Sequence, residues 1–401
     1  MSSPAETVCP ACGSVHGRAF YRVDSIPVHS VLLMDSRDEA REYPRRELEL
    51  WFCEDCGFIH NRRFDASVHE YSPKCEESQA FSGTFNKFAA GLAKDYIERY
   101  EPKTALEIGC GKGDFLVGLC ELSDCKGIGI DPGLQPERIE SSASDRLEWI
   151  VDFYDERYKH LQADLVLCRH TLEHIGPVAD FMRGVRGAVG DDPSTVVAFE
   201  LPDVETILIE NGFWDIYYEH CSYFTLGSLS RLFEHVNLTP HRLEKCFDDQ
   251  YLLIDSRPGE AKGGLEAAED LERTRQQVTA FEKGVQTTMA SWRDFVTEAH
   301  QRGEKTILWG SGSKAVAFLT TLGFDEEIAC MTDINPYRHD KFVPGSGHEI
   351  VPPQKLRDIK PDNVIVMNPI YLEEIGKDLA EMGLTPHMVA VGPDLQRVRA
   401  I

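Results

Sequence analysis

The segment from Trp214 to Phe224 concentrates side chains that can move protons. It holds two carboxylates, Asp215 and Glu219, together with three tyrosines and the histidine His220. A histidine suits base catalysis because its unperturbed pKa lies near neutrality, and tyrosine hydroxyls can donate hydrogen bonds. The cluster predicts an acid–base site in which Glu219 or a tyrosine fixes the tautomer of His220. An aromatic packing loop is the alternative interpretation.

Four cysteines form two C-x-x-C pairs, Cys9 with Cys12 and Cys53 with Cys56. A glycine follows each pair, in CPACG and CEDCG, and suits a tight turn around bound thiolates. We expect the four thiolates to hold one structural Zn²⁺ tetrahedrally, with no open coordination position. A redox pair is the alternative, but neither C-x-x-C opens a helix of a thioredoxin-like unit.

A glycine-rich turn links a predicted strand to a predicted helix at residues 107–113. Its glycines let a ligand approach the backbone closely, and its spacing is neither a dinucleotide G-x-G-x-x-G nor a P-loop. The E-x-G-x-G-x-G pattern resembles motif I of class I S-adenosylmethionine (SAM)-dependent methyltransferases, where the loop faces the methionine and ribose. A generic Rossmann turn is the alternative. The motif residues are Glu107, Gly109, Gly111 and Gly113.

Carboxylates that end the next two predicted strands favour the SAM interpretation. Asp131 follows Gly113 by 18 residues and can accept both hydroxyls of a ribose. Asp152 and Phe153 end the third strand, where the carboxylate can accept the adenine amino group and the ring can pack on adenine. We therefore expect SAM as the cofactor.

The fourth strand runs into Arg169, His170 and His174. Strand carboxyl ends hold the ligands of open α/β sheets, so we assign Arg169 to the cofactor site. Each histidine is a candidate for the site or for a structural hydrogen bond.

A second segment, at the start of the central domain, adds Tyr71 and Ser78 to the expected cofactor site. Glu76 and Glu77 lie between them. They either begin a solvated helix or contact the methionine ammonium group of SAM.

Apolar runs alternate with helical patterns and predict an α/β fold with parallel sheets covered on both faces. In the central part, strands are expected at 104–109, 125–131, 147–152, 163–169 and 195–202, and helices at 85–100, 113–122 and 178–189. A long helix at 260–303 is followed by a smaller αβ unit with apolar segments at 305–319, 328–336 and 362–369.

These patterns divide the chain into three expected domains. Residues 1–70 form a zinc-binding module, residues 71–255 the SAM-binding domain, and residues 256–401 the long helix with a Rossmann-like domain. The first module has too little core to be stable alone, so a metal would close its long loop. A charged stretch at 37–50 within it is expected to be extended.

The composition excludes broad classes of partner. The 401 residues include 67 acidic and 42 basic side chains, giving a net charge of −25, which would repel nucleic acids and anionic membranes. No apolar stretch approaches the roughly 18 residues of a membrane helix, and the N-terminus lacks a signal pattern. We expect a cytoplasmic monomer or weak homodimer that acts on a small molecule.

Many segments together resemble one three-domain family, the SAM-dependent C-methyltransferases of deoxysugar nucleotides in antibiotic biosynthesis and their relatives. The resemblance runs through nearly the whole chain. It covers CPACG, IPVHSVLL, CEDCG, LEIGCGKGDFL, GIGIDP, RHTLEHI, YYEHCSYFT, LWGSGSKAVAFL, TDINPYRHDKFVPGSGHEIVPP and MNPIYLEEI.

The resemblance implies a zinc-binding domain, a class I SAM-methyltransferase Rossmann domain and a Rossmann-like domain that closes the substrate cleft. Its Tyr-x-Glu-His motif is intact from Tyr217 to His220. The family histidine, here His220, removes a proton next to a keto group, and the enolate takes the methyl of SAM. We expect Glu219 to orient this base, and Tyr217 and His174 to bind the substrate oxygen.

One departure bears on the substrate, because Cys75 stands where family members carry a site tyrosine. Gly310-x-Gly312 with Lys314 could cradle a phosphate of a nucleotide-linked substrate, with Arg338 and Lys341 adding charge; simple turn chemistry is the alternative. Two other functions stay open. One is O- or N-methylation of a small molecule, and the other is a non-catalytic scaffold that binds SAM and zinc.

Overall fold

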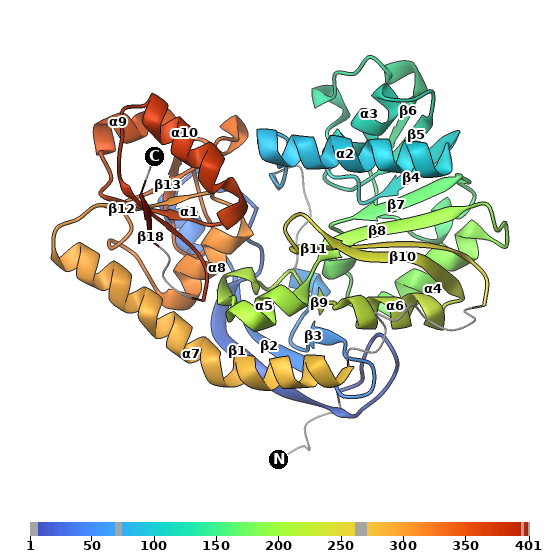
Figure 1. Ribbon diagram of the computed structural model, residues 1–401, viewed down its shortest axis with the longest axis horizontal. Helices are drawn as coiled ribbons and strands as arrows, with labels where there is room; N and C mark the ends of the chain where they lie inside the picture. Colours follow the sequence, from blue (N-terminus) through green and yellow to red (C-terminus); the bar gives the residue numbers. More distant parts are fainter. Residues whose placement is uncertain (1–6, 69–73, 261–270, 394–396, 400–401) are drawn as a thin grey trace.

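Three β-sheets organise the chain (Figure 1). The computed structural model describes residues 7–68, 74–260, 271–393 and 397–399. The predicted α/β fold is confirmed, because two of the sheets are mainly parallel and carry helices on both faces.

None of the described helices is both long and apolar enough to cross a membrane.

The N-terminal sheet is antiparallel, with the order β1-β2-β3-β9. Its strands are β1 (Gly17–Pro27), β2 (Arg45–Cys53), β3 (Ile59–Asn61) and β9 (Ser222–Tyr223), with α1 (Arg37–Glu42) between the first two. The strand β9 comes from the central part of the chain. The expectation of an extended stretch at 37–50 is wrong for its first residues, because Ser36 caps a helix by accepting the backbone N–H of Glu39.

The central sheet has the order β10-β11-β8-β7-β4-β5-β6. Its strands are β4 (Thr104–Ile108), β5 (Lys126–Ile130), β6 (Leu147–Ile150), β7 (Leu165–Arg169), β8 (Val196–Pro202), β10 (Leu238–Cys246) and β11 (Tyr251–Pro258). The first five are parallel and confirm the five predicted strands, whereas β11 runs antiparallel to both β8 and β10.

Helices cover both faces of the central sheet (Figure 1). They are α2 (Gly83–Tyr100), α3 (Asp114–Glu121), α4 (Val178–Val189), α5 (Val204–Glu210) and α6 (Leu226–His235). Tyr96 of α2 and Leu116 of α3 belong to the core on one face, and Met182 of α4 and Phe233 of α6 to the core on the other. The predicted helices at 85–100, 113–122 and 178–189 are therefore confirmed.

The C-terminal sheet has the order β14-β15-β13-β12-β16-β17-β18, with β14 and β18 antiparallel to their neighbours. Its strands are β12 (Thr306–Trp309), β13 (Met331–Thr332), β14 (Lys341–Phe342), β15 (Glu349–Val351), β16 (Asn363–Val366), β17 (His387–Ala390) and β18 (Arg397–Arg399). Its helices are α8 (Ser313–Leu322), α9 (Leu356–Ile359) and α10 (Leu372–Glu381).

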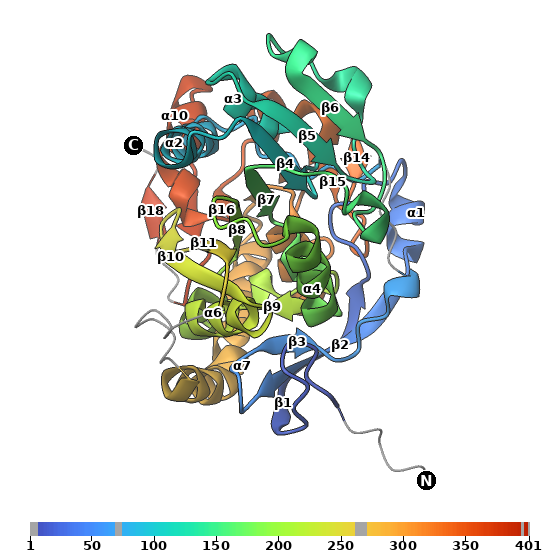
Figure 2. The ribbon, with the colours of Figure 1, turned by 90° about the vertical axis from the view of Figure 1, so that its right-hand side faces the viewer.

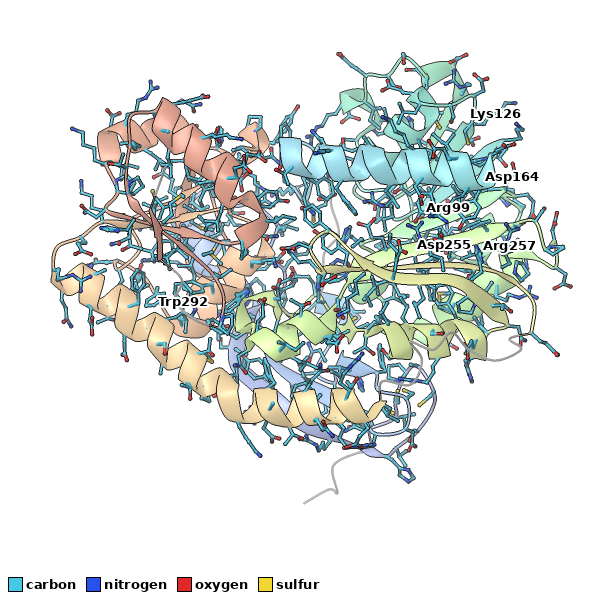
Figure 3. The ribbon with its side chains drawn as sticks, viewed as in Figure 1. Arg99, Lys126, Asp164, Asp255, Arg257 and Trp292 are labelled. Carbon is cyan, nitrogen blue, oxygen red and sulfur yellow. The ribbon has the colours of Figure 1, made fainter. Side chains whose placement is uncertain are left out.

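The long helix α7 (Leu271–Gln301) joins the domains. It runs beside the N-terminal sheet below the central sheet and reaches the C-terminal domain (Figures 1 and 2). Trp292 anchors its second half by packing edge-on against Phe318 of α8, with ring centroids 5.2 Å apart (Figure 3). The first part of the helix expected at 260–303 falls on residues 261–270, which lie outside the described residues.

Candidate active site

One cavity of about 1690 Å³ lies where the carboxyl ends of the central and C-terminal parallel strands meet. Its central wall includes the motif I loop and the ends of β5, β7 and β8, and its C-terminal wall includes the ends of β12, β13 and β16. Residues 77–82 line it as well. The volume exceeds the roughly 300–1,000 Å³ of a typical small-molecule pocket, so two ligands fit together.

The motif I loop needs its glycines for conformation and for space. Gly109, Gly111 and Gly113 have φ values of 69°, 55° and 84°, in the left-handed region that L side chains rarely adopt. A Cβ on Gly109 would lie only 2.0 Å from Oγ1 of Thr171. The loop therefore holds a backbone shape that favours glycine, and Gly109 and Gly111 line the cavity.

Two predicted cofactor carboxylates lie in this cavity. Asp131 accepts the backbone N–H groups of Gly111 at 3.0 Å and Gly133 at 2.6 Å, which fixes its orientation. Glu107 is 2% exposed, and burial raises its pKa to about 8. Its Oε2 has no hydrogen-bond partner among the described residues. An orphaned buried oxygen that faces a cavity fits a ligand with donors, as the SAM expectation requires.

Of Asp152 and Phe153, only Phe153 lines the cavity. Phe153 lines the cavity and is 58% exposed, so part of its ring is accessible to a bound base. The Asp152 carboxylate accepts the Tyr158 hydroxyl at 2.7 Å and pairs with Arg157 at 2.7 Å. Asp152 is also not among the residues that line the cavity. Its predicted contact with adenine is therefore not formed by this geometry.

Arg169 and Ser78 both line the cavity, and both already have hydrogen-bond partners. Arg169 pairs with Glu200, with its Nε 2.9 Å from Oε2 and its Nη2 3.1 Å from Oε1. The assignment of Arg169 to the cofactor site stays a prediction. Ser78 donates to Asp114 at 2.8 Å. Tyr71 lies outside the described residues.

Glu76 and Glu77 have different surroundings. Glu76 accepts Asn335 at 3.0 Å and Arg138 at 3.1 Å, so it ties the C-terminal domain to the central one. Glu77 lines the cavity, 3.6 Å from Lys112, and burial raises its pKa to about 7. Of the two residues, Glu77 has the position expected for a contact with an ammonium group.

The predicted base lies among aromatic and titratable side chains in the cavity wall. The ring centroid of His220 is 4.2 Å from that of Tyr217 and 4.7 Å from that of His174. One ligand atom each of His220, His174 and Glu173 lies within 4.8 Å of the others. The structure therefore brings together the histidines and tyrosine that were predicted from separate segments.

Glu219 is held differently from the prediction that its carboxylate orients His220. Its Oε1 accepts the backbone N–H of Ser30 at 2.8 Å and also the Ser30 hydroxyl. Ser30 in turn lies 2.6 Å from Ser313 of α8, so all three domains meet here. The backbone carbonyl of Glu219 accepts Nδ1 of His174 at 3.1 Å, so the residue positions His174 directly.

The four predicted metal ligands converge at the edge of the N-terminal sheet. The Sγ atoms of Cys9 and Cys56 are 3.7 Å apart, and those of Cys12 and Cys53 are 3.6 Å apart. All four lie within 4.8 Å of one another. Bonds of about 2.3 Å to one tetrahedral ion separate sulfurs by about 3.8 Å, so the donor set fits Zn²⁺.

Cys75 does not stand in the cavity wall. It is buried, and its Sγ lies 3.5 Å from Nε2 of His29, which is itself buried. The cysteine therefore does not replace the hydroxyl of a site tyrosine.

The basic side chains near the second glycine turn are already paired. Lys314 pairs with Asp215 at 2.8 Å, and Lys341 pairs with Asp35 at 2.6 Å. Arg338 donates to the Ser311 carbonyl at 2.8 Å. They offer less free charge to a phosphate than the sequence indicated.

Sequence reasoning missed three residues that shape the site: Ser30, Glu173 and Glu200. Ser30 lies in IPVHSVLL, a segment that carried the family resemblance without an assigned role. Glu173 lies between two considered residues in RHTLEHI, so its place next to His174 was the available signal. Glu200 is buried within an apolar strand, and an acidic residue there was a signal for an internal partner.

Comparisons with known proteins agree with this geometry. A methyltransferase domain family matches residues 62–243, and a C-methyltransferase C-terminal domain family matches residues 262–385. The C-methyltransferase NovU of Streptomyces niveus is 27% identical over 390 residues, which cover 92% of this chain and 90% of that protein.

Two solved structures are similar at lower identity. Human N-acetylserotonin methyltransferase in complex with SAM is 15% identical, with a TM-score of 0.33 over 43% of this chain and 52% of that chain. The N,N-8-amino-8-demethyl-D-riboflavin dimethyltransferase RosA from Streptomyces davawensis is 17% identical, with a TM-score of 0.35 over 43% of this chain and 56% of that chain.

The two matched families follow one another along the chain, and the NovU alignment covers 92% of the chain. The expected cofactor is thereby confirmed as SAM, and the chain is an enzyme. It is a SAM-dependent methyltransferase, and its C-terminal part matches a C-methyltransferase C-terminal domain.

Proposed function

We propose that this enzyme methylates a carbon atom next to a carbonyl group and that His220 is the base. The observation that carries the proposal is the grouping of His220, His174 and Tyr217 in the cavity that also contains the motif I loop. A carbon acid of this kind needs a base for its proton and a donor for the developing oxyanion. This group offers both.

The proton balance follows from the side chains. A nitrogen of His220 takes the proton from the substrate carbon, and the electron pair of that C–H bond moves onto the carbonyl oxygen. Tyr217 donates a hydrogen bond to this oxygen, since burial raises its pKa and keeps it protonated. Donors fixed before the reaction stabilise such an oxyanion more than water does.

SAM supplies the methyl group, which the substrate carbon takes from the sulfonium as the carbonyl re-forms. Glu107, Asp131, Glu77 and the motif I glycines would hold the cofactor, with Phe153 against the adenine. The residues that would bind SAM are therefore different from His220, which takes the proton.

A nucleotide-linked keto-deoxysugar is the substrate class that we propose, in a pathway that makes a secondary metabolite. The C-terminal wall supports this choice. The cavity volume leaves room beside SAM, and Gly312, Ser313 and Lys314 at the start of α8 line the cavity, where no side chain caps the helix. Since Lys314 is paired with Asp215, phosphate contacts would come from backbone N–H groups at the start of α8.

The N-terminal cluster holds Zn²⁺ in this proposal. The ion would be structural, because all four ligands are protein thiolates and the cluster is not among the residues that line the cavity. Its effect on catalysis would pass through β3, which pairs with β9 directly after the Tyr-x-Glu-His motif.

Solvent exchange tests the base separately from methyl transfer. In D₂O with S-adenosylhomocysteine, the enzyme should exchange the acidic C–H of a nucleotide-linked keto-deoxysugar, and His220→Asn should abolish this exchange. His235→Asn, at an exposed histidine at the end of α6, is the matched control. Undiminished exchange in His220→Asn overturns the base assignment.

Product NMR with [methyl-¹³C]SAM tests the atom that receives the methyl group. A new C–CH₃ signal supports the proposal, whereas an O–CH₃ or N–CH₃ signal shows that the same site serves a hydroxyl or an amine.

A further inference from the structure

A line of charged side chains connects the core of the central sheet with the proposed base. Basic side chains and glutamates alternate along it. In spatial order they are Arg169, Glu200, His170, Glu173 and His220.

The inner end of this line is fixed. Glu200 is 1% exposed and receives two hydrogen bonds from Arg169 and one from His170. Burial alone would raise its pKa, but the two cationic neighbours outweigh burial and hold the pKa at about 2. Glu200 is therefore a carboxylate at every pH where the enzyme is folded and active.

His170 occupies the middle of the line in a costly backbone conformation, with φ at 48°. Its Nε2 lies 2.8 Å from Glu200 and its Nδ1 lies 3.6 Å from Glu173. Burial favours the neutral ring, but the two glutamates outweigh it and raise the pKa of His170 to about 9. The ring of Tyr251, 4.5 Å away, covers it from β11.

Glu173 is the residue that the proposed reaction leaves unexplained. Its side chain is 3% exposed, and Oε2 has no hydrogen-bond partner in the part of the chain that the structure describes. One of its carboxylate oxygens lies within 4.8 Å of a ring nitrogen of His174 and of His220. A buried oxygen without a donor is costly, which indicates a function that needs it.

We infer that Glu173 is a positioning residue that stabilises the positive charge which His220 acquires when it takes the substrate proton. This inference rests on the proposed role of His220 as the base. The proton stays on the imidazole and does not pass to Glu173. An opposite charge within about 4–6 Å favours the charged form of a group. His170 lies between Glu173 and Glu200, and these two glutamates keep His170 charged.

The titration of His220 tests this role without a substrate. The full-length zinc-containing protein, labelled with [¹³C]histidine and saturated with S-adenosylhomocysteine, is titrated by NMR, and His220→Asn assigns the signal. The groups that face His220 are Tyr217, Tyr223, His174 and Glu173.

Two variants should shift the titration of His220 in opposite directions. In Glu173→Gln the midpoint should fall by about one pH unit or more, and in His170→Asn it should rise, because Glu173 loses its counter-charge. Glu173→Asp should keep most of the wild-type value. Glu140→Gln removes a carboxylate from another part of the cavity wall and should change nothing.

The possible results separate this inference from the proposed base. If His220→Asn abolishes exchange but the His220 midpoint is the same in wild type and Glu173→Gln, only the inference about Glu173 is wrong. If His220→Asn still exchanges, the base assignment itself is wrong. A second metal ion per chain that is lost in Glu173→Gln also overturns the inference, because Glu173 would then be a metal ligand.

Discussion

Nδ1 of His174 lies 3.1 Å from the backbone carbonyl oxygen of Glu219. A carbonyl oxygen only accepts, and burial lowers the pKa of His174, so its ring is neutral with the hydrogen on Nδ1. Nε2 therefore carries a lone pair that can accept a hydrogen bond. The backbone of the Tyr-x-Glu-His motif thus sets the tautomer of the second histidine.

Substitution of His174 should separate the contact of its Nδ1 with Glu219 from the role of its Nε2 in the reaction. Asparagine can place its Nδ2 where Nδ1 lies, so His174→Asn should keep the contact with Glu219 and the melting temperature. It lacks Nε2, and we expect kcat to fall about 100-fold or more. Steady-state kinetics and thermal unfolding measure both. A variant with normal kcat would exclude Nε2 from the reaction.

Loss of the metal should disturb the active site through the N-terminal sheet. Asn61 of β3 donates its backbone N–H to the carbonyl of Cys221 at 2.9 Å, one residue after His220. We expect Cys12→Ser to lose Zn²⁺, to unfold at lower temperature and to lose kcat more than affinity for SAM. Elemental analysis and calorimetry check this.

The control for that experiment is Cys246→Ser, which changes a thiol outside the cluster. It should retain one zinc ion per chain. Equal metal content in wild type and Cys12→Ser would contradict the four-thiolate site.

The motif I loop should not tolerate a methyl group at its first glycine. Gly109→Ala forces a left-handed alanine, which costs roughly 1–2 kcal/mol, and brings its Cβ to 2.0 Å from Oγ1 of Thr171. We expect at least about 2 kcal/mol lower stability and no measurable SAM binding. Urea unfolding and calorimetry report the two effects.

Gly118→Ala provides the comparison, because this residue lies within α3 and nothing lies within 4 Å of an added Cβ. It should be about 0.5–1 kcal/mol more stable than wild type. If Gly118→Ala were also destabilised, the free space around a glycine and its φ value would not explain the loss of stability in Gly109→Ala.

Stability without cofactor should fall as the pH rises from about 5 to 8. Burial raises the pKa of Glu107 to about 8 and that of Glu219 to about 7, so the folded chain holds protons that the unfolded chain has lost. Each unit of difference in pKa corresponds to about 1.4 kcal/mol. Glu107→Gln should weaken this pH dependence, which urea unfolding at pH 5, 6.5 and 8 would measure. An unchanged slope would show that Glu107 titrates normally.

Local patterns predicted most of the central domain correctly. Five parallel strands, the motif I turn and the strand-end Asp131 depend on residues close in sequence, so their periodicity and spacing were sufficient. The strand β10 was missed because it is an edge strand whose residues are mostly polar and half-buried, without the apolar run of a central strand.

The sequence did not predict partners that are distant along the chain. The parallel register of β7 and β8 places Arg169 opposite Glu200, which pairs with it. One carboxylate oxygen of Glu219 is held by Ser30, 189 residues away along the chain. Residue type and local spacing carry no information on such contacts.

The pairing of β3 with β9 also bears on how the chain folds during synthesis. The four cysteines of the predicted metal site lie within the first 56 residues, whereas β9 begins at residue 222. Until that segment leaves the ribosome, the outer edge of β3 has no strand to pair with, and an open edge invites pairing between chains. A chain interrupted before the Tyr-x-Glu-His motif thus lacks the proposed base and exposes an edge prone to aggregation.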